Sequence, residues 1–189
     1  RAVCYGAGSV KGFVTPEVWR RGITVSSAAP MNAVPVAEYT LAMILLAHKR
    51  CWEVMRKPGR QASPAHPVPG NYRRTVGLIS ASMVGREVIR LLKVTDLRVL
   101  LYDPFVDTAE AARLGVEKVE LPALMAESDV VSLHAPNLPE LRGMINGELL
   151  ALIRDGATFI NTARGALVDE PALLAELQSG RIYAILDVK

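Results

Sequence analysis

Two charged side chains in the second half of the sequence have the type and setting for ligand chemistry. Arg164 lies in a glycine-flanked turn directly after an apolar run. A guanidinium there can hold a carboxylate through two parallel hydrogen bonds, and the alternative is a salt bridge with nearby Asp169 or Glu170. Asp103 ends the apolar run 98–102. A carboxylate in that position can accept hydrogen bonds from two sugar hydroxyls and repel a phosphate.

The turn that precedes this acid carries a degenerate fingerprint. The run Thr75–Ile79 is followed by the residues SASMVG, where a dinucleotide-binding turn has G-x-G-x-x-G. Gly85 keeps the glycine that lets helix and strand pack closely, while Ser80 and Ser82 replace the other two. The Ser82 hydroxyl can donate to a phosphate oxygen or crowd it. With Asp103 eighteen residues beyond Gly85, the stretch predicts a dinucleotide-binding unit, and a unit without a ligand remains the alternative.

Other polar residues carry weaker signals. His134 follows an apolar run and could act as an acid, but a lone histidine at a strand end more often bonds to backbone, and we favour that reading. Asp187 either holds a carboxamide or caps the next loop. His48 and His66 lie at a helix end and in a proline-rich loop, and nothing links either to chemistry.

The elements that position these residues alternate regularly from residue 75 onward. We expect strands at 75–79, 98–102, 117–119, 130–134, 158–161 and 182–187, and helices at 84–93, 108–114, 122–127, 147–153 and 170–179. This alternation predicts an α/β fold, a doubly wound, Rossmann-like parallel sheet covered by helices on both faces. Ligands bind at the carboxyl ends of such strands, where the polar residues above would meet.

The first third of the chain predicts a second unit. We expect a strand at 1–5, a helix that begins at Thr15 and stops at Gly22, and a strand at 23–26. A helix from Asn32 is apolar on nearly every face, which is typical of burial between domains or subunits. Because four prolines then mark 56–71 as a linker, we predict a partial flavodoxin-like domain at 1–32, an interdomain helix and linker at 33–70, and a dinucleotide-binding domain at 71–189.

Composition narrows the classes of partner. The net charge is only +3 over 189 residues and no basic block is present, which argues against nucleic acid. Two cysteines give no disulfide framework and no metal-ligand spacing, so we expect a reducing cytoplasm and no metal. The most apolar stretch, 33–47, contains Glu38 and is too short to span a bilayer, so we expect no membrane association.

With these residues laid out, the sequence resembles the D-isomer-specific 2-hydroxyacid dehydrogenases, which include phosphoglycerate, glycerate and D-lactate dehydrogenases. The resemblance covers nearly the whole chain. The segments that carry it are GAG at 6–8, Asn32 with VAE at 36–38, the serine turn with Asp103, SLHAP at 132–136, RGMI at 142–145, INTARG at 160–165 with LVD at 167–169, and LDV at 186–188.

The resemblance implies a role for each matching position. Arg164 matches the arginine that holds the substrate carboxylate, Asp103 the ligand of the adenosine ribose, and Asp187 the acid near the nicotinamide carboxamide. The other matching positions are Ser82, Met83 and Val84 at the pyrophosphate, Ala135, Thr162 and Ala163 along the cofactor, and Ala7 and Gly8 beside substrate and nicotinamide. The helix from Asn32 matches the one that packs in the family's homodimer.

The implied reaction is hydride transfer between NAD and C2 of a small 2-hydroxy or 2-keto acid. Family enzymes move the substrate proton with a histidine and glutamate downstream of the segment that matches 186–188, and none of the three histidines here matches that position. We therefore expect an interior portion of a longer enzyme, with a fragment that binds cofactor without turnover as the alternative, and in either case a chain that is inactive alone. The alternatives are a non-catalytic NAD-sensing regulator, like the C-terminal-binding-protein corepressors, and a structural relative with a closed cofactor site.

Overall fold

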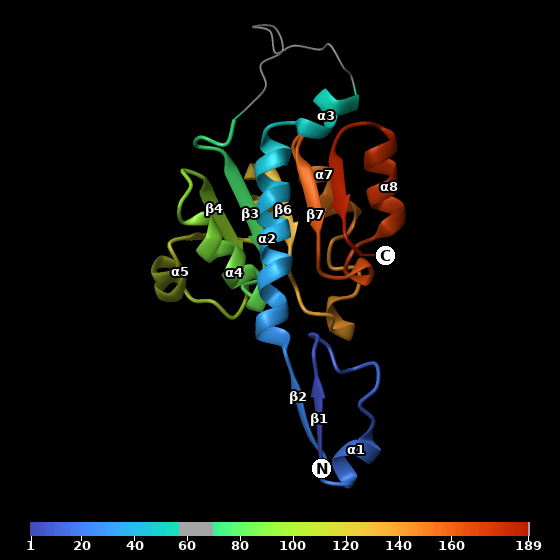
Figure 1. Cartoon of the computed structure of the whole chain (residues 1–189). Helices are drawn as coiled ribbons and strands as arrows, with labels where there is room; N and C mark the ends of the chain where they lie inside the picture. Colours follow the sequence, from blue (N-terminus) through green and yellow to red (C-terminus); the bar gives the residue numbers. More distant parts are fainter. Residues whose placement is uncertain (57–69, 189) are drawn as a thin grey trace, which may run out of the picture.

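The larger part of the molecule is a six-stranded sheet in which every strand is parallel to its neighbours. The computed structural model describes residues 1–56 and 70–188, and Figure 1 shows its two units. The strands follow the order β5-β4-β3-β6-β7-β8. Their bounds are β3 Thr75–Ile79, β4 Arg98–Tyr102, β5 Glu117–Lys118, β6 Val130–Leu133, β7 Thr158–Asn161 and β8 Tyr183–Leu186. The chain winds outward from β3 to β5 and returns on the other side of β3 as β6, which confirms the doubly wound fold.

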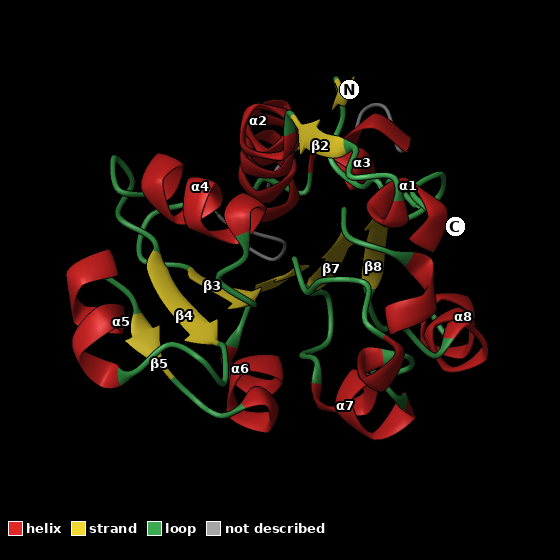
Figure 2. Cartoon of the chain, turned by 90° about the horizontal axis from the view of Figure 1, so that it is seen from below, coloured by secondary structure: helices red, strands yellow, loops and turns green. Residues whose placement is uncertain are grey.

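Helices cover both faces of this sheet. Figure 2 shows α2 and α4 on one face and α6 and α7 on the other. The helices are α2 Ala29–His48, α4 Met83–Leu92, α5 Thr108–Leu114, α6 Leu121–Glu127, α7 Gly147–Leu152 and α8 Glu170–Gln178. Successive residues of each central strand point to opposite faces. Phe159 therefore packs in the cluster under α6 to α8, and Ile160 in the cluster under α2 and α4.

The smaller unit is a parallel pair of strands with one short helix. It comprises β1 Ala2–Tyr5, α1 Pro16–Arg20 and β2 Thr24–Ser27. In Figure 1 it lies below the large sheet, on the side where the strands of that sheet end. Our prediction of these three elements agrees with the structure to within a few residues, and their assignment to a flavodoxin-like domain stays a prediction.

Helix α2 begins earlier than expected. The sequence places Pro30 before the helix, but the structure starts it at Ala29 with that proline in the first turn. Proline is compatible with this position because the first amides of a helix have no intrahelical partner. The helix therefore crosses the predicted boundary between residues 32 and 33 without interruption.

The same helix corrects our argument about membranes. Its 20 residues extend over about 30 Å, so by length and composition alone it could span a bilayer, and it is the one such helix among the described residues. Its buried residues recur at helical spacing and form one stripe, at Ala33, Ala37, Thr40, Ile44 and Ala47. Since the stripe faces the large sheet and α4, while Glu38 and Tyr39 are exposed, α2 is buried along one side only, although its residues are apolar on nearly every face.

Two further differences concern the connections. The helix α3 Cys51–Arg56 was not among the helices that we expected. Short 3-10 turns, η1 Pro139–Leu141 and η2 Gly165–Leu167, follow β6 and β7. Most of the predicted linker at 56–71 lies outside the described residues.

Candidate functional site

The site lies where the strands of the large sheet end. All six strands run in one direction, so the turns after β3, β4, β6, β7 and β8 meet at one edge. This is the edge that faces the β1–β2 unit in Figure 1. The winding reverses between β3 and β6, and the crevice at such a reversal is the ligand site of doubly wound sheets.

The turn after β3 has the geometry of a fingerprint turn although only one of its glycines remains. Ser80 has φ of 79°, in the left-handed region that favours glycine. A Cβ on Gly85 would overlap the backbone carbonyl oxygen of Ser80, so only glycine fits there. Ser82 is the N-cap of α4, and its Oγ accepts a hydrogen bond from the Gly85 N–H at 3.3 Å.

This capping leaves a defined set of amides at the start of α4. The Gly85 N–H donates to the Ser82 hydroxyl, and the Arg86 N–H donates to the Ser82 carbonyl. Within the described part of the chain, the N–H groups of Met83 and Val84 have no partner and belong to the first turn of a ten-residue helix. Together with the helix dipole they suit an anion.

Asp103 is built into the same turn. Its side chain is only 6% exposed. Oδ2 accepts hydrogen bonds from the Ala81 N–H at 2.8 Å and from the Ser80 hydroxyl at 3.2 Å, and Oδ1 accepts one from the Phe105 N–H at 2.8 Å. The carboxylate that the sequence indicated therefore contacts the serine turn directly.

The loop after β7 is held by Asn161. Its Nδ2 donates to the Arg164 carbonyl, and its Oδ1 accepts from the Ala163 N–H, both at 2.9 Å. Thr162 is buried, and its hydroxyl lies 3.4 Å from that of Thr40 on α2. Because Thr40 donates its own proton to the Val36 carbonyl, Thr162 is the donor in this pair. The loop is therefore tied to the sheet and to α2.

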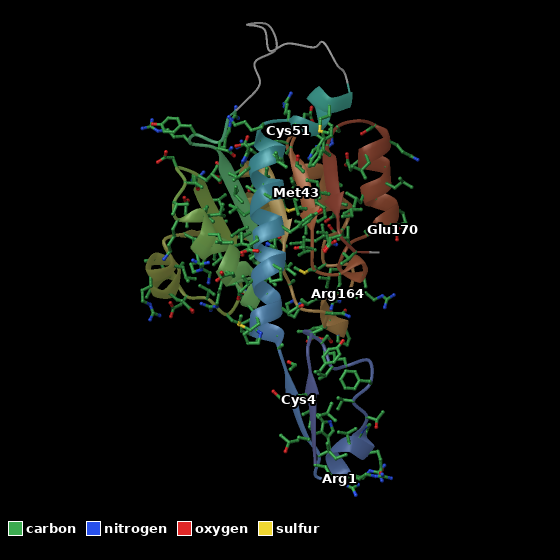
Figure 3. All side chains as sticks on the ribbon, viewed as in Figure 1. Arg1, Cys4, Met43, Cys51, Arg164 and Glu170 are labelled. Atoms are coloured by element: carbon green, nitrogen blue, oxygen red, sulfur yellow. The ribbon has the colours of Figure 1, made fainter. Side chains whose placement is uncertain are left out.

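Arg164 extends from this loop toward solvent. Its Nη1 donates to the Ala163 carbonyl at 2.6 Å, and it forms no ion pair among the described residues. Asp169, which we weighed as its partner, instead caps α8 by accepting from the Ala172 N–H. Figure 3 labels Arg164 at the lower edge of the large unit, which is the edge nearest the smaller one. The salt-bridge alternative is thus wrong for this structure.

His134 is part of the core behind the site. Its ring is buried, and its Nε2 forms a 3.0 Å hydrogen bond with the Ser132 hydroxyl. Burial lowers the pKa of His134 from 6.5 to about 4, so the ring is neutral near pH 7. We expected a backbone partner, and that was wrong. Residues two apart in a strand share a face, which brings Ser132 to the ring.

Of the remaining predicted positions, two follow strands at the same edge and two belong to the smaller unit. Asp187 is exposed just after β8, and its N–H donates to the Asn161 carbonyl at 3.1 Å. Ala135 is 5% exposed and follows β6. Ala7 and Gly8 follow β1, with Gly8 beside the side chain of Asn32.

A polar contact joins the two units near this edge. The Lys11 ammonium donates to the carbonyl of Asn137, in the loop after β6, at 3.0 Å. Among the described residues, no group of three His, Cys, Asp or Glu side chains is placed to hold a metal ion.

The sequence did not predict the contacts that three residues of the site make. They are Ser80 against Asp103, Asn161 bracing its loop, and Thr40 contacting that loop from α2. An asparagine at a strand end before a turn is a signal for such a brace. The contact of Thr40 had no signal, since 122 residues separate it from Thr162.

A doubly wound parallel sheet, a capped helix after its first strand and an acid after its second define a dinucleotide-binding domain. Residues 41–189 match the model of the D-isomer specific 2-hydroxyacid dehydrogenase, NAD binding domain. The chain belongs to this family.

Individual relatives agree with this assignment. The chain is 34% identical over 172 residues to D-3-phosphoglycerate dehydrogenase of Archaeoglobus fulgidus, covering 89% of this chain and 33% of that protein. It is 32% identical to D-lactate dehydrogenase of Escherichia coli, over 96% of this chain and 55% of that protein.

A solved structure extends the likeness to three dimensions. D-lactate dehydrogenase from Aquifex aeolicus, complexed with NAD and lactic acid, superposes with a TM-score of 0.80 at 31% identity, covering 100% of this chain and 57% of that one. The chain thus spans between a third and about three fifths of the length of these relatives.

Proposed function

We propose that this chain is the cofactor-binding part of an NAD-dependent oxidoreductase that transfers a hydride between NAD and C2 of a small 2-hydroxy or 2-keto acid. The observation that carries the proposal is the Asp103 carboxylate, fixed against the fingerprint turn at the reversal of the sheet. A carboxylate there accepts ribose hydroxyls and repels a 2′-phosphate, which favours NAD over NADP.

The residues present fit the adenosine and pyrophosphate parts of NAD. The unpaired amides of Met83 and Val84 are donors for phosphate oxygens. Because the Ser82 oxygen already accepts from Gly85, its proton is free to point outward to the same phosphate. Of the two roles that we weighed for this hydroxyl, donation therefore suits the geometry better than crowding.

The other strand ends fit the nicotinamide half. Ala135, Thr162 and Ala163 are small or buried and would line the cofactor, while the exposed Asp187 carboxylate would accept from the carboxamide. When bound, NAD supplies the hydride acceptor or donor. The protein's part is to hold the ring at a fixed distance from substrate and keep water out.

Arg164 is the proposed substrate ligand. Its guanidinium is exposed and free of acidic partners among the described residues, so it can grip a carboxylate through two parallel bonds. Ala7 and Gly8, on the β1–β2 unit, would close over the same substrate. His134 is neutral and buried, so we do not assign it the transfer of the substrate proton.

We further propose a cytoplasmic homodimer. Helix α2 exposes Met31 and Tyr39. An apolar groove of about 760 Å³ lies between α2, α3, α8 and β8 and is lined by Tyr39, Met43, Trp52 and Met55 with the side chains of β8. These surfaces suit a subunit contact more than solvent. Light scattering at several concentrations measures the mass and tests the dimer.

We also propose the domain limits at 1–32 and 71–189.

The decisive experiment is calorimetric titration of the chain with NAD and with NADP, together with Asp103→Ala. We expect NAD to bind in the micromolar to sub-millimolar range, NADP to bind more weakly, and the variant to lose most of the NAD affinity. Asp107→Ala is the matched control, because Asp107 is a nearby carboxylate that only caps α5. Equal NAD affinity in the Asp103 variant and in the unmodified chain would refute the assignment.

A further inference from the structure

The contact between Ser80 and Asp103 has no counterpart in a turn that begins with glycine. Ser80 Oγ lies 3.2 Å from Asp103 Oδ2. Hydroxyl–carboxylate bonds are usually 2.5–2.7 Å long, so this one is weak and readily exchanged. Ser80 also holds φ of 79°, a conformation that glycine adopts without steric cost.

The contact matters because it occupies one of the few positions at which the Asp103 carboxylate can accept a hydrogen bond. A carboxylate has about four lone-pair positions, two on each oxygen. On Oδ2 the Ala81 N–H and the Ser80 hydroxyl take both, and on Oδ1 the Phe105 N–H takes one. A single position therefore remains for the two hydroxyls of a ribose, which need two.

The two backbone donors cannot leave without opening the turn. The Ala81 N–H belongs to the fingerprint turn and the Phe105 N–H to the connection after β4, and both bonds are 2.8 Å long. The Ser80 hydroxyl can leave by rotation about one side-chain bond. It is the one donor that a ribose hydroxyl can displace.

We propose that the Ser80 hydroxyl competes with the adenosine ribose for Oδ2 of Asp103, so that Ser80 sets the affinity of this site for the cofactor. The inference rests on the proposed role of Asp103 and concerns a residue to which the proposed function gives no part. It makes Ser80 a residue that weakens cofactor binding through its hydroxyl group rather than through its bulk.

Two variants separate the hydroxyl from the backbone conformation. Ser80→Ala removes the hydroxyl and keeps the side chain at the positive φ. Ser80→Gly removes the hydroxyl and the steric cost together, and it serves if the alanine variant folds poorly. We expect both to bind NAD about fivefold more tightly than the unmodified chain, as the loss of one competing hydrogen bond predicts.

The test compares two ligands in each protein by calorimetry: NAD and its analogue with 2′-deoxyadenosine. In the unmodified chain we expect loss of the 2′-hydroxyl to weaken binding less than threefold, because Oδ2 is occupied. In Ser80→Ala we expect the same loss to weaken binding about tenfold, because that hydroxyl then has its acceptor. A general change in fold would not alter this ratio between ligands.

Three outcomes decide the matter. Tighter NAD binding by the Ser80 variants with the enlarged deoxy effect supports the competition. Unchanged or weaker NAD binding by both variants overturns it, even if Asp103→Ala still loses affinity, and the proposed function then stands alone. If Asp103→Ala binds NAD as well as the unmodified chain does, the proposed function fails and this inference fails with it.

Discussion

The histidine behind the site should make the stability of this chain depend on pH well above the range where carboxylates titrate. His134 is buried, and burial lowers its pKa from 6.5 to about 4. As pH falls below 6.5, the unfolded chain takes up a proton that the folded chain refuses, so unfolding becomes easier. Well above pH 6.5, at about pH 7.5 and higher, the ring is almost wholly neutral in both states and contributes little dependence.

The size of the effect follows from the two pKa values. Their difference of about 2.5 pKa units corresponds to roughly 3 kcal/mol once the pH is below both values. At pH 5.0 the linkage relation gives a loss of about 2 kcal/mol relative to pH 7.5. His48, whose pKa burial also lowers, adds a loss of the same sign.

The assay is urea unfolding followed by circular dichroism at pH 7.5, 6.0 and 5.0. The comparison is between the unmodified chain and His134→Asn, which keeps a polar group near Ser132 but does not titrate. We expect the variant to be less stable at pH 7.5 and to lose about 2 kcal/mol less than the unmodified chain between pH 7.5 and 5.0. His48 is common to both proteins and cancels. Parallel losses in the two proteins would show that His134 is protonated normally in the fold and would refute the reasoning.

Three further substitutions test the turn and its neighbours. Gly85→Ala places a Cβ on the Ser80 carbonyl. We expect thermal unfolding to show a loss of at least about 3 kcal/mol in the free energy of unfolding and calorimetry to show no NAD binding. Unchanged stability would contradict the geometry. Asn161→Ala leaves the Ala163 N–H and the Arg164 carbonyl unpaired. We expect it to lower the free energy of unfolding, measured in urea, by about 2 kcal/mol, and an unchanged value would contradict this role of Asn161. Ser82→Ala removes the cap of α4 and should cost about 1 kcal/mol and weaken NAD binding, whereas tighter binding would mean that the hydroxyl crowds the phosphate.

Much of the architecture could be predicted because burial on both faces of a parallel sheet leaves a strong pattern. The run Thr75–Ile79 is mostly apolar, the run Thr158–Asn161 has an apolar centre between two polar ends, and both are strands with every residue buried. The rule that ligand residues follow such strands then brought Asp103 and Arg164 to one edge. The regular alternation of strands and helices along the sequence implies a parallel sheet, and this was sufficient to place both residues at one edge.

What could not be predicted depended on context that no local pattern contains. Pro30 is a helix breaker in the interior and acceptable in the first turn, so its position in α2 followed only from the surrounding structure. The hydrogen bond of Ser80 to Asp103 needs the turn to be folded first, because 23 residues separate the two. His134 and Ser132 are neighbours along a strand, yet their pairing depends on which face the core buries.

Helix α2 connects the β1–β2 unit directly to the large sheet and α4. One residue separates the end of β2 at Ser27 from the start of the helix at Ala29, so the β1–β2 unit has almost no slack relative to the helix. A tilt of about 10° would move the far end of a rod of about 30 Å by roughly 5 Å. Thr40 lies partway along the helix, and its hydroxyl contacts that of Thr162 in the loop that carries Arg164. A displacement of the smaller unit that tilted α2 would therefore also move Thr162 at the cofactor edge, by less than it moves the end of the helix.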